Sequence, residues 1–108
     1  MALKEECGVF GYYSTEDRPN IAKTVYYGLF ALQHRGQEAC GIAVNKDRVT
    51  TCKKDLGLVS DVFSDADLTA MPGNISIGHV RYSTIGSNTR ENAQPLCGSY
   101  VRGTLAIA

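Results

Sequence analysis

The amino-acid sequence predicts an α+β fold in which short strands surround one amphipathic helix. Residues 8–13 alternate small residues with bulky aromatic and β-branched ones, which is typical of a strand. Ile21, Val25 and Leu29 recur every four residues and place an apolar stripe on one face of a helix. Residues 39–44 are small and apolar, as in a buried strand, and polar turn residues follow them. One amphipathic helix between strands of these two kinds indicates the α+β class.

The helix is predicted over residues 20–35, with Asp17 or Asn20 suited to its N-cap and Gly36 to its C-cap. A hairpin is expected to follow it, because a second strand-like run comes directly after the turn that ends the first. The other expected elements are a turn over residues 14–19, a turn over 45–47, a strand over 48–53, a short helix over 58–63, a loop over 65–73, a strand over 74–82, a long polar loop over 83–95 and a last strand over 100–108.

The composition excludes several classes of protein for this chain of 108 residues, which is the size of one small domain. Eleven acidic and eleven basic residues give a formal net charge of zero, so the chain lacks the positive field that nucleic-acid binding requires. The longest uncharged apolar stretch, residues 24–32, is too short to cross a bilayer. Residues 1–6 have no apolar run and do not resemble a secretory signal. We therefore expect a soluble cytoplasmic protein that binds neither nucleic acid nor membranes.

The four cysteines, at positions 7, 40, 52 and 97, lie too far apart for the close ligand pairs of structural zinc sites. Without an export signal a disulfide framework is not expected, so the thiols are predicted to be free. Cys40 and Cys52 lie in strand-like runs and are expected to be small buried hydrophobic residues. No metal site is predicted.

Four short segments carry residue types found in active sites. They are Glu-Glu-Cys-Gly-Val-Phe-Gly at 5–11, Leu-Gln-His-Arg-Gly-Gln-Glu at 32–38, Gly-His-Val-Arg-Tyr-Ser-Thr at 78–84 and Asn-Ala-Gln-Pro-Leu at 92–96. Each segment alone is unspecific, but their order and spacing resemble the glutaminase domain of the class II glutamine amidotransferases. Within that class the chain is most similar to the amidophosphoribosyltransferases, and the similarity extends over residues 5–108.

The resemblance implies the fold of the N-terminal-nucleophile hydrolases, a four-layer αββα sandwich, of which this chain holds a part. It assigns residues 1–6 to a propeptide and residues 7–108 to the N-terminal portion of the glutamine amidotransferase domain. Cys7 is then the catalytic nucleophile, and its own α-amino group, whose pKa lies near physiological pH, takes the thiol proton. That amine exists only after cleavage between Glu6 and Cys7. The neighbouring Gly8 is expected to leave room for the substrate.

The family motif Gly-His-x-Arg-Tyr implies roles for the third segment. It places the arginine that binds the α-carboxylate of glutamine on Arg81, because a guanidinium holds a carboxylate through two parallel hydrogen bonds. Tyr82 and Thr84 are implied to line the glutamine pocket. His79 shares a strand face with Arg81 and is expected to be structural. Arg35, in the second segment, is expected to order the loop of the nucleophile from outside the substrate site.

Full-length members of the family join this domain to a phosphoribosyltransferase domain. Ammonia from glutamine passes to phosphoribosyl pyrophosphate and forms 5-phosphoribosylamine, the first step of de novo purine synthesis. The resemblance implies Mg²⁺ on the phosphates, an iron–sulfur cluster in some relatives, and a homo-oligomer. The transferase domain is absent here, as are the Asn-Gly oxyanion donors that follow the strand ending at Ala108 in the family. We therefore expect an N-terminal part of such an enzyme, without a cofactor of its own and with little activity alone.

Two alternatives remain open. Glucosamine-6-phosphate synthase, asparagine synthetase and glutamate synthase use the same glutaminase fold, but their arginine motif usually continues with Trp where this chain has Tyr82. The other alternative is a non-catalytic protein, either a regulatory glutamine-binding remnant or an inert fragment.

Overall fold

The computed structural model describes residues 7–33, 38–82, 93–100 and 103–108, which form strands and helices in two antiparallel sheets and one helical layer. The strands are β1 (Gly8–Arg18), β2 (Ala39–Lys46), β3 (Val49–Leu56), β4 (Gly73–Arg81), β5 (Leu96–Tyr100) and β6 (Gly103–Ile107), and the helices are α1 (Ile21–Leu32), α2 (Val59–Val62) and α3 (Asp65–Thr69). The predicted α+β class is confirmed. None of the described helices is long and apolar enough to cross a membrane.

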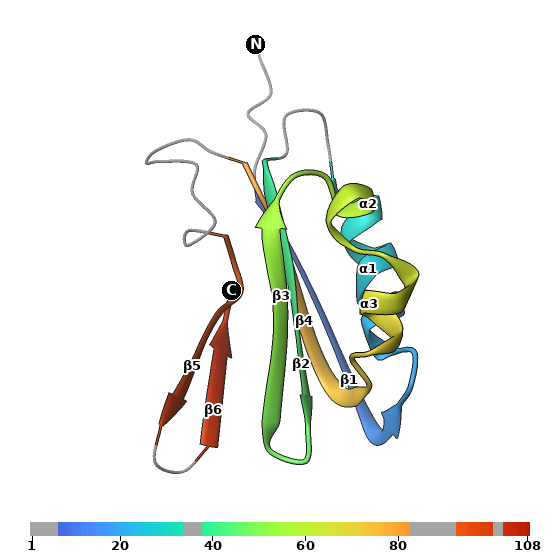
Figure 1. Cartoon of the computed structure of the whole chain (residues 1–108), viewed down its shortest axis with the longest axis vertical. Coiled ribbons are helices and arrows are strands. Elements are labelled where there is room, and N and C mark those ends of the chain that lie inside the picture. The colour runs from blue at the N-terminus through green and yellow to red at the C-terminus, as the bar shows by residue number, and fades with distance from the viewer. Residues whose placement is uncertain (1–6, 34–37, 83–92, 101–102) are drawn as a thin grey trace.

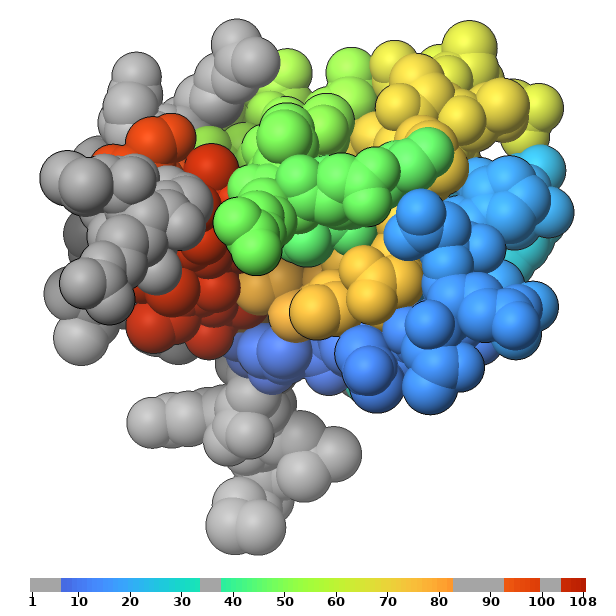
Figure 2. Space-filling view, turned by 90° about the horizontal axis from the view of Figure 1, so that it is seen from below, coloured from blue at the N-terminus to red at the C-terminus, as the bar shows by residue number. Residues whose placement is uncertain are grey.

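The two sheets form separate layers. The larger sheet has the strand order β1-β4-β2-β3, so β4 and β2 are its central strands, and β5 pairs with β6 in the smaller sheet. The helices lie on one side of the larger sheet and the β5–β6 hairpin on the other (Figure 1). Seen from below, the hairpin lies against β2, β3 and β4 (Figure 2). The described residues therefore form a helical layer, a four-stranded sheet and a small second sheet.

The apolar stripe of α1 packs on the middle of the larger sheet. Ile21, Val25 and Leu29 are each at most 1% exposed, as their four-residue spacing predicts. Gly78 of β4 lies directly under the helix, because a Cβ atom there would come within 2.6 Å of Val25 Cγ1 and 2.8 Å of Leu29 Cδ1. The missing side chain at this position lets the helix and the strand approach closely.

Both ends of α1 differ from the prediction. Asn20 occupies the N-cap position, but its side chain makes no capping hydrogen bond. The helix ends at Leu32, three residues earlier than predicted, because Gln33 is already extended with ψ at 142°. The Gln33 side-chain oxygen accepts a hydrogen bond of 3.3 Å from the Val59 main-chain N–H, which connects the end of α1 to α2. The predicted C-cap, Gly36, lies outside the described residues.

The first strand is longer than predicted. Residues 14–19 were expected to form a turn, but the strand continues to Arg18, which pairs with Gly73 of β4 after an irregularity in the register. Ser14 is only 8% exposed, and its hydroxyl accepts hydrogen bonds from Arg18 Nε (3.1 Å) and from the Glu16 main-chain N–H (3.3 Å). These bonds allow residues typical of turns to remain in a strand.

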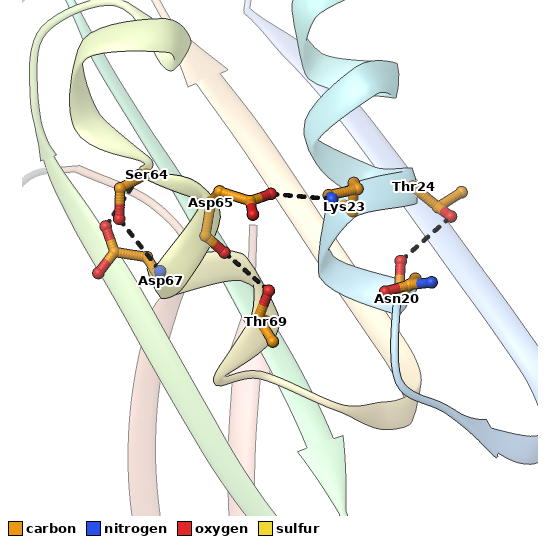
Figure 3. Close-up of polar contacts among 7 residues, drawn as sticks. All are labelled: Asn20, Lys23, Thr24, Ser64, Asp65, Asp67 and Thr69. Atoms are coloured by element: carbon orange, nitrogen blue, oxygen red, sulfur yellow. Dashed lines mark hydrogen bonds and ion pairs between the residues drawn. The ribbon is translucent and has the colours of Figure 1, made fainter.

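A helix occupies part of residues 65–73, which were expected to form a loop. Ser64 caps α3, because its hydroxyl accepts from the Asp67 N–H (3.1 Å) while the Asp67 carboxylate accepts from the Ser64 N–H (3.0 Å). Asp65 also forms an ion pair of 2.8 Å with Lys23 of α1 (Figure 3). The Ser-x-x-Asp spacing of Ser64 and Asp67 is the local sequence signal for this capping box.

The predicted β2–β3 hairpin is confirmed, although its turn lies closer to the C-terminus than expected. Asp47 and Arg48 join the strands, and their φ angles are 49° and 70°. Two central residues with positive φ form a two-residue turn of type I′, which suits the twist of a hairpin. The last predicted strand, residues 100–108, is instead the second half of another hairpin, in which Leu96 of β5 pairs with Ile107 of β6.

Gly41 of β2 should not tolerate a side chain. An added Cβ atom would overlap the Gln94 carbonyl oxygen and lie 2.9 Å from Pro95 Cδ. We expect Gly41→Ala to lower the free energy of unfolding by ~1–3 kcal/mol through overpacking, as measured by urea denaturation. Gly98→Ala in β5 is the matched control, because an added Cβ there has no atom within 4 Å, and it should leave stability nearly unchanged. Equal losses in both variants would contradict the packing of residues 93–95 on β2.

Candidate active site

Cys7 lies at the start of β1, where its exposed thiol contacts the main chain that follows β4. The Tyr82 N–H donates to Cys7 Sγ at 3.4 Å, and the thiol lies 3.8 Å from the Tyr82 carbonyl oxygen, to which it donates. The antiparallel pairing of β1 with β4 explains the contact, because Gly8 pairs with Val80. The same register, continued by one residue, places Cys7 opposite Arg81. The first and third segments singled out in the sequence are therefore adjacent at one end of the sheet.

Cys7 and Arg81 share one face of the sheet. Successive residues of a strand point to opposite faces, and residues directly opposite in an antiparallel pair point to the same face. Val80 and Tyr82 belong to the core under α1, so His79 and Arg81 lie on the other face. Cys7, opposite Arg81, lies on that face as well. The predicted nucleophile and the predicted carboxylate-binding residue are thus brought together.

Tyr82 reaches this site through its main chain. Its side chain is 4% exposed and packs in the hydrophobic core with residues of α1, β2 and β4. The phenol ring therefore lies away from the face of Cys7, while the Tyr82 N–H and carbonyl both contact the thiol. Any role of Tyr82 in lining a substrate pocket would be through these main-chain groups.

The C-terminal end of β4 is also connected to β2 and to the end of β3. Arg81 pairs with Ala39 of β2, and its carbonyl oxygen accepts a hydrogen bond of 2.9 Å from the Glu38 N–H. The Glu38 carbonyl in turn accepts a hydrogen bond of 2.8 Å from the Gly57 N–H. The sequence analysis assigned no role to Glu38 or Gly57, because a main-chain contact between distant segments leaves no pattern in the residue types.

Gly8 does not provide the room for substrate that the sequence suggested. A Cβ atom there would lie 3.0 Å from Val80 Cγ2 and 3.1 Å from Leu32 Cβ. The space beside Gly8 is therefore filled by the core on the helix side, and the missing side chain lets β1 pack under the end of α1. This part of the prediction is wrong, because Gly8 and Cys7 face opposite sides of the strand.

His79 is buried on the same face as Arg81. It is 4% exposed, and its Nδ1 atom has no hydrogen-bond partner among the residues that the structure describes. The desolvation of the ring lowers the pKa of His79, and the positive charge of Arg81 lowers it further. A neutral, buried imidazole agrees with the structural role that was expected for it.

The remaining predicted site residues lie outside the described part of the chain. Arg35 falls within residues 34–37 and Thr84 within residues 83–92, and the propeptide assigned to residues 1–6 is outside as well. Among the described residues, no three His, Cys, Asp or Glu side chains gather where they could hold a metal ion.

Comparison with known proteins addresses the resemblance directly. No family model matches the chain. The amidophosphoribosyltransferase of Mycobacterium tuberculosis (strain ATCC 25618 / H37Rv) is 54% identical over 101 residues, which cover 94% of this chain and 19% of the relative. A solved glutamine phosphoribosylpyrophosphate amidotransferase from B. subtilis, complexed with ADP and GMP, has a TM-score of 0.74 at 41% identity and covers 91% of this chain and 20% of its own. The chain is homologous to the amidophosphoribosyltransferases.

A second solved structure, described as the allosteric regulatory enzyme of purine biosynthesis, has a TM-score of 0.78 at 41% identity and covers 91% of this chain and 21% of its own. The family resemblance inferred from the four segments is confirmed. The chain spans about a fifth of the length of the amidophosphoribosyltransferases that it matches.

Protonation of His79 should destabilise the fold. The pKa of His79 in the folded chain lies below the ordinary value of 6.5. As the pH falls through 6.5, the unfolded chain therefore binds more protons than the folded chain does. Stability that is present at about pH 7.5 should therefore decrease toward about pH 5.5, as measured by urea denaturation at both values. His79→Gln should remove this part of the pH dependence, and His34→Gln, the change of the other histidine, should retain it. An unchanged slope in His79→Gln would contradict the assignment.

Proposed function

We propose that this chain is the nucleophile-bearing part of an amidophosphoribosyltransferase, which hydrolyses glutamine and transfers the ammonia to phosphoribosyl pyrophosphate. The product is 5-phosphoribosylamine, and the reaction is the first step of de novo purine synthesis. One observation carries the proposal: the Cys7 thiol lies against the Tyr82 main chain, opposite Arg81, in a segment that is 54% identical to an amidophosphoribosyltransferase. A thiol nucleophile beside a carboxylate-binding arginine suits a substrate with an amide at one end and a carboxylate at the other.

Cys7 attacks the side-chain amide carbon of glutamine after cleavage between Glu6 and Cys7. The freed α-amino group of Cys7 takes the thiol proton, and the attack forms a tetrahedral oxyanion. The protonated amine then gives its proton to the leaving nitrogen, and ammonia departs. Water hydrolyses the glutamyl thioester, which releases glutamate and regenerates the thiol. The Tyr82 N–H, 3.4 Å from Cys7 Sγ, is placed to hold the sulfur in position during these steps.

Arg81 binds the α-carboxylate of glutamine through its guanidinium and so orients the amide toward Cys7. Thr84 lines the same pocket, Tyr82 contributes through its main chain, and Arg35 orders the nucleophile's loop from outside the substrate site. The buried Tyr82 ring supports this arrangement, because it anchors the main chain that touches Cys7.

The complete enzyme supplies what this segment lacks. We propose that residues 7–108 form the N-terminal portion of a four-layer αββα sandwich, in which the β5–β6 hairpin belongs to the second sheet. The phosphoribosyltransferase domain, the Mg²⁺ on its phosphates and any iron–sulfur cluster then belong to the rest of a cytoplasmic homo-oligomer. Because the chain spans about a fifth of its relatives, we expect the 108 residues alone to release little glutamate from glutamine.

Removal of residues 1–6 should make Cys7 reactive toward glutamine analogues. We expect a chain that begins at Cys7 to form a covalent adduct with an analogue that carries an electrophilic side chain, because the free amine can then deprotonate the thiol. Peptide mass spectrometry should place the adduct on Cys7. The chain that begins at Met1 should react on the order of 10²–10⁴-fold more slowly, the contribution typical of general base catalysis.

Two variants test whether this labelling is specific. Cys7→Ser should abolish the adduct, whereas Cys97→Ser, the change of another exposed cysteine, should leave it unchanged. Equal labelling of the two chains, or adducts spread evenly over the four cysteines, would support the inert fragment and contradict the proposal.

Arg81→Lys should slow labelling by the glutamine analogue on the order of 10–100-fold, because a hydrogen bond to a charged group contributes ~1.5–3 kcal/mol and lysine cannot bind a carboxylate in the same bidentate manner. The rate is measured on the chain that begins at Cys7. Iodoacetamide, which has no carboxylate, is the control reagent and should label both proteins at the same rate. A parallel loss with both reagents would show that Arg81 acts on the fold around Cys7 rather than on the substrate.

A further inference from the structure

One row of side chains on β3 faces the β5–β6 hairpin. Thr50, Cys52 and Lys54 alternate along the strand and so share a face. The Thr50 hydroxyl lies 2.6 Å from the Thr104 hydroxyl of β6, and Lys54 Nζ donates to the Ala93 carbonyl at 2.9 Å. Cys52, between them, lies in the middle of the contact between the two sheets.

Cys97 of β5 lies on the face of the hairpin that meets this row. Cys97 pairs with Ala106, and Ser99 pairs with Thr104, so all four residues share one face of the small sheet. Thr104 contacts β3, as described above, and the same face therefore directs Cys97 toward β3. The Cys52 thiol lies 3.8 Å from the Pro95 carbonyl oxygen, two residues before Cys97, so the chain brings Cys97 to the same part of β3.

We propose that Cys52 and Cys97 are a redox pair that forms an intramolecular disulfide by exchange with a low-molecular-weight disulfide such as oxidised glutathione. The two thiols are free, Cys52 lies beside the chain that leads into β5, and Cys97 is on the hairpin face that meets β3, so the two side chains can approach each other. Cys7 takes no part, because it lies at the other edge of the larger sheet, on β1.

The exchange proceeds in two steps. Cys97, the exposed member, loses its proton and attacks one sulfur of oxidised glutathione, which forms a mixed disulfide and releases one glutathione thiol. Cys52 then loses its proton and attacks the Cys97 sulfur, which expels the second glutathione. Each sulfur of the protein is oxidised by one electron, and the glutathione disulfide takes up both electrons.

The second step controls the rate. Burial, with a smaller contribution from Cys97, raises the pKa of the Cys52 thiol to about 12, and the charge of nearby Lys54 opposes the shift. Because only the thiolate attacks, ring closure should become faster as the pH rises above neutral. In a reducing compartment the pair remains as two thiols, as the sequence predicts.

The disulfide would join the β5–β6 hairpin covalently to the larger sheet. The link would close a loop between positions 52 and 97 and so restrict the unfolded chain. We expect oxidation to raise the Tm of the chain by roughly 10 °C, since a link that closes a loop of this length is strongly stabilising.

The test uses the 108-residue chain, incubated with oxidised glutathione at about pH 8.5, where exchange is faster. We expect a mass decrease equal to two hydrogen atoms, a cross-linked peptide pair that contains Cys52 and Cys97, and a Tm increase that reductant reverses. Cys7→Ser and Cys40→Ser should retain the Tm increase, and Cys97→Ser should lose it. Cys97 is exposed, so its replacement should not prevent folding. Cys52→Ser is the second variant and should lose the Tm increase as well.

Three results would overturn the inference. One is a stable mixed disulfide between glutathione and Cys97 without ring closure. Another is a cross-link that joins Cys7 to another cysteine. The third is a Tm increase that persists in Cys97→Ser. Labelling of Cys7 by glutamine analogues measures a different residue, so this inference and the proposed function can fail separately.

Discussion

The burial of α1 against the central strands β4 and β2 is the interaction on which the other features of this fold depend. Ile21, Val25 and Leu29 are fully buried there, and each buried aliphatic side chain of this size stabilises the fold by ~1.5–3 kcal/mol. Because β4 lies between β1 and β2, a helix that packs on β4 also orders the strands on both sides. Tyr82 extends the same core past the end of β4, and its main chain is the point where Cys7 is held. The position of the thiol therefore depends on the core in which the Tyr82 ring is buried.

Side chains along β4 alternate between the face that packs against the helices and the face that carries the candidate site. Val80 and Tyr82 face the helix and belong to the core, while His79 and Arg81 face the opposite side together with Cys7. A substitution on the helix side therefore changes the packing of the core, whereas one on the other side changes the surroundings of the Cys7 thiol. The two layers on either side of the larger sheet are also attached differently. The helices are held by apolar packing, whereas the described contacts on the other side include the Thr50–Thr104 hydroxyl hydrogen bond and bonds from Lys54 and Cys52 to the Ala93 and Pro95 carbonyls, just before β5.

Local patterns in the sequence predicted the elements whose apolar residues recur with the period of a helix or a strand. The stripe of α1, the buried strand β2 and the hairpin that follows it were all predicted correctly. The strand extension to Arg18 was missed because its stability comes from pairing with Gly73, far away in the sequence. The α3 helix was missed although its capping box is a local signal. Only a final strand over residues 100–108 was predicted where the structure has the β5–β6 hairpin, because the hairpin is stabilised partly by contacts with β3, such as that between Thr50 and Thr104.

The sequence by itself determined the α+β class, the resemblance to the amidophosphoribosyltransferases and the candidate site residues, because residue type and spacing are local properties that a long matched string preserves. It named Cys7 and Arg81 without showing that they are adjacent. The tertiary structure decided that they share a face, that Tyr82 reaches the site through its main chain, and that Gly8 serves packing rather than substrate access. It also placed Cys52 beside the chain that leads into β5, with Cys97 on the hairpin face that meets β3. These relations depend on strand register and on the packing of the layers. A shift of the register by one residue would move every side chain of a strand to the opposite face.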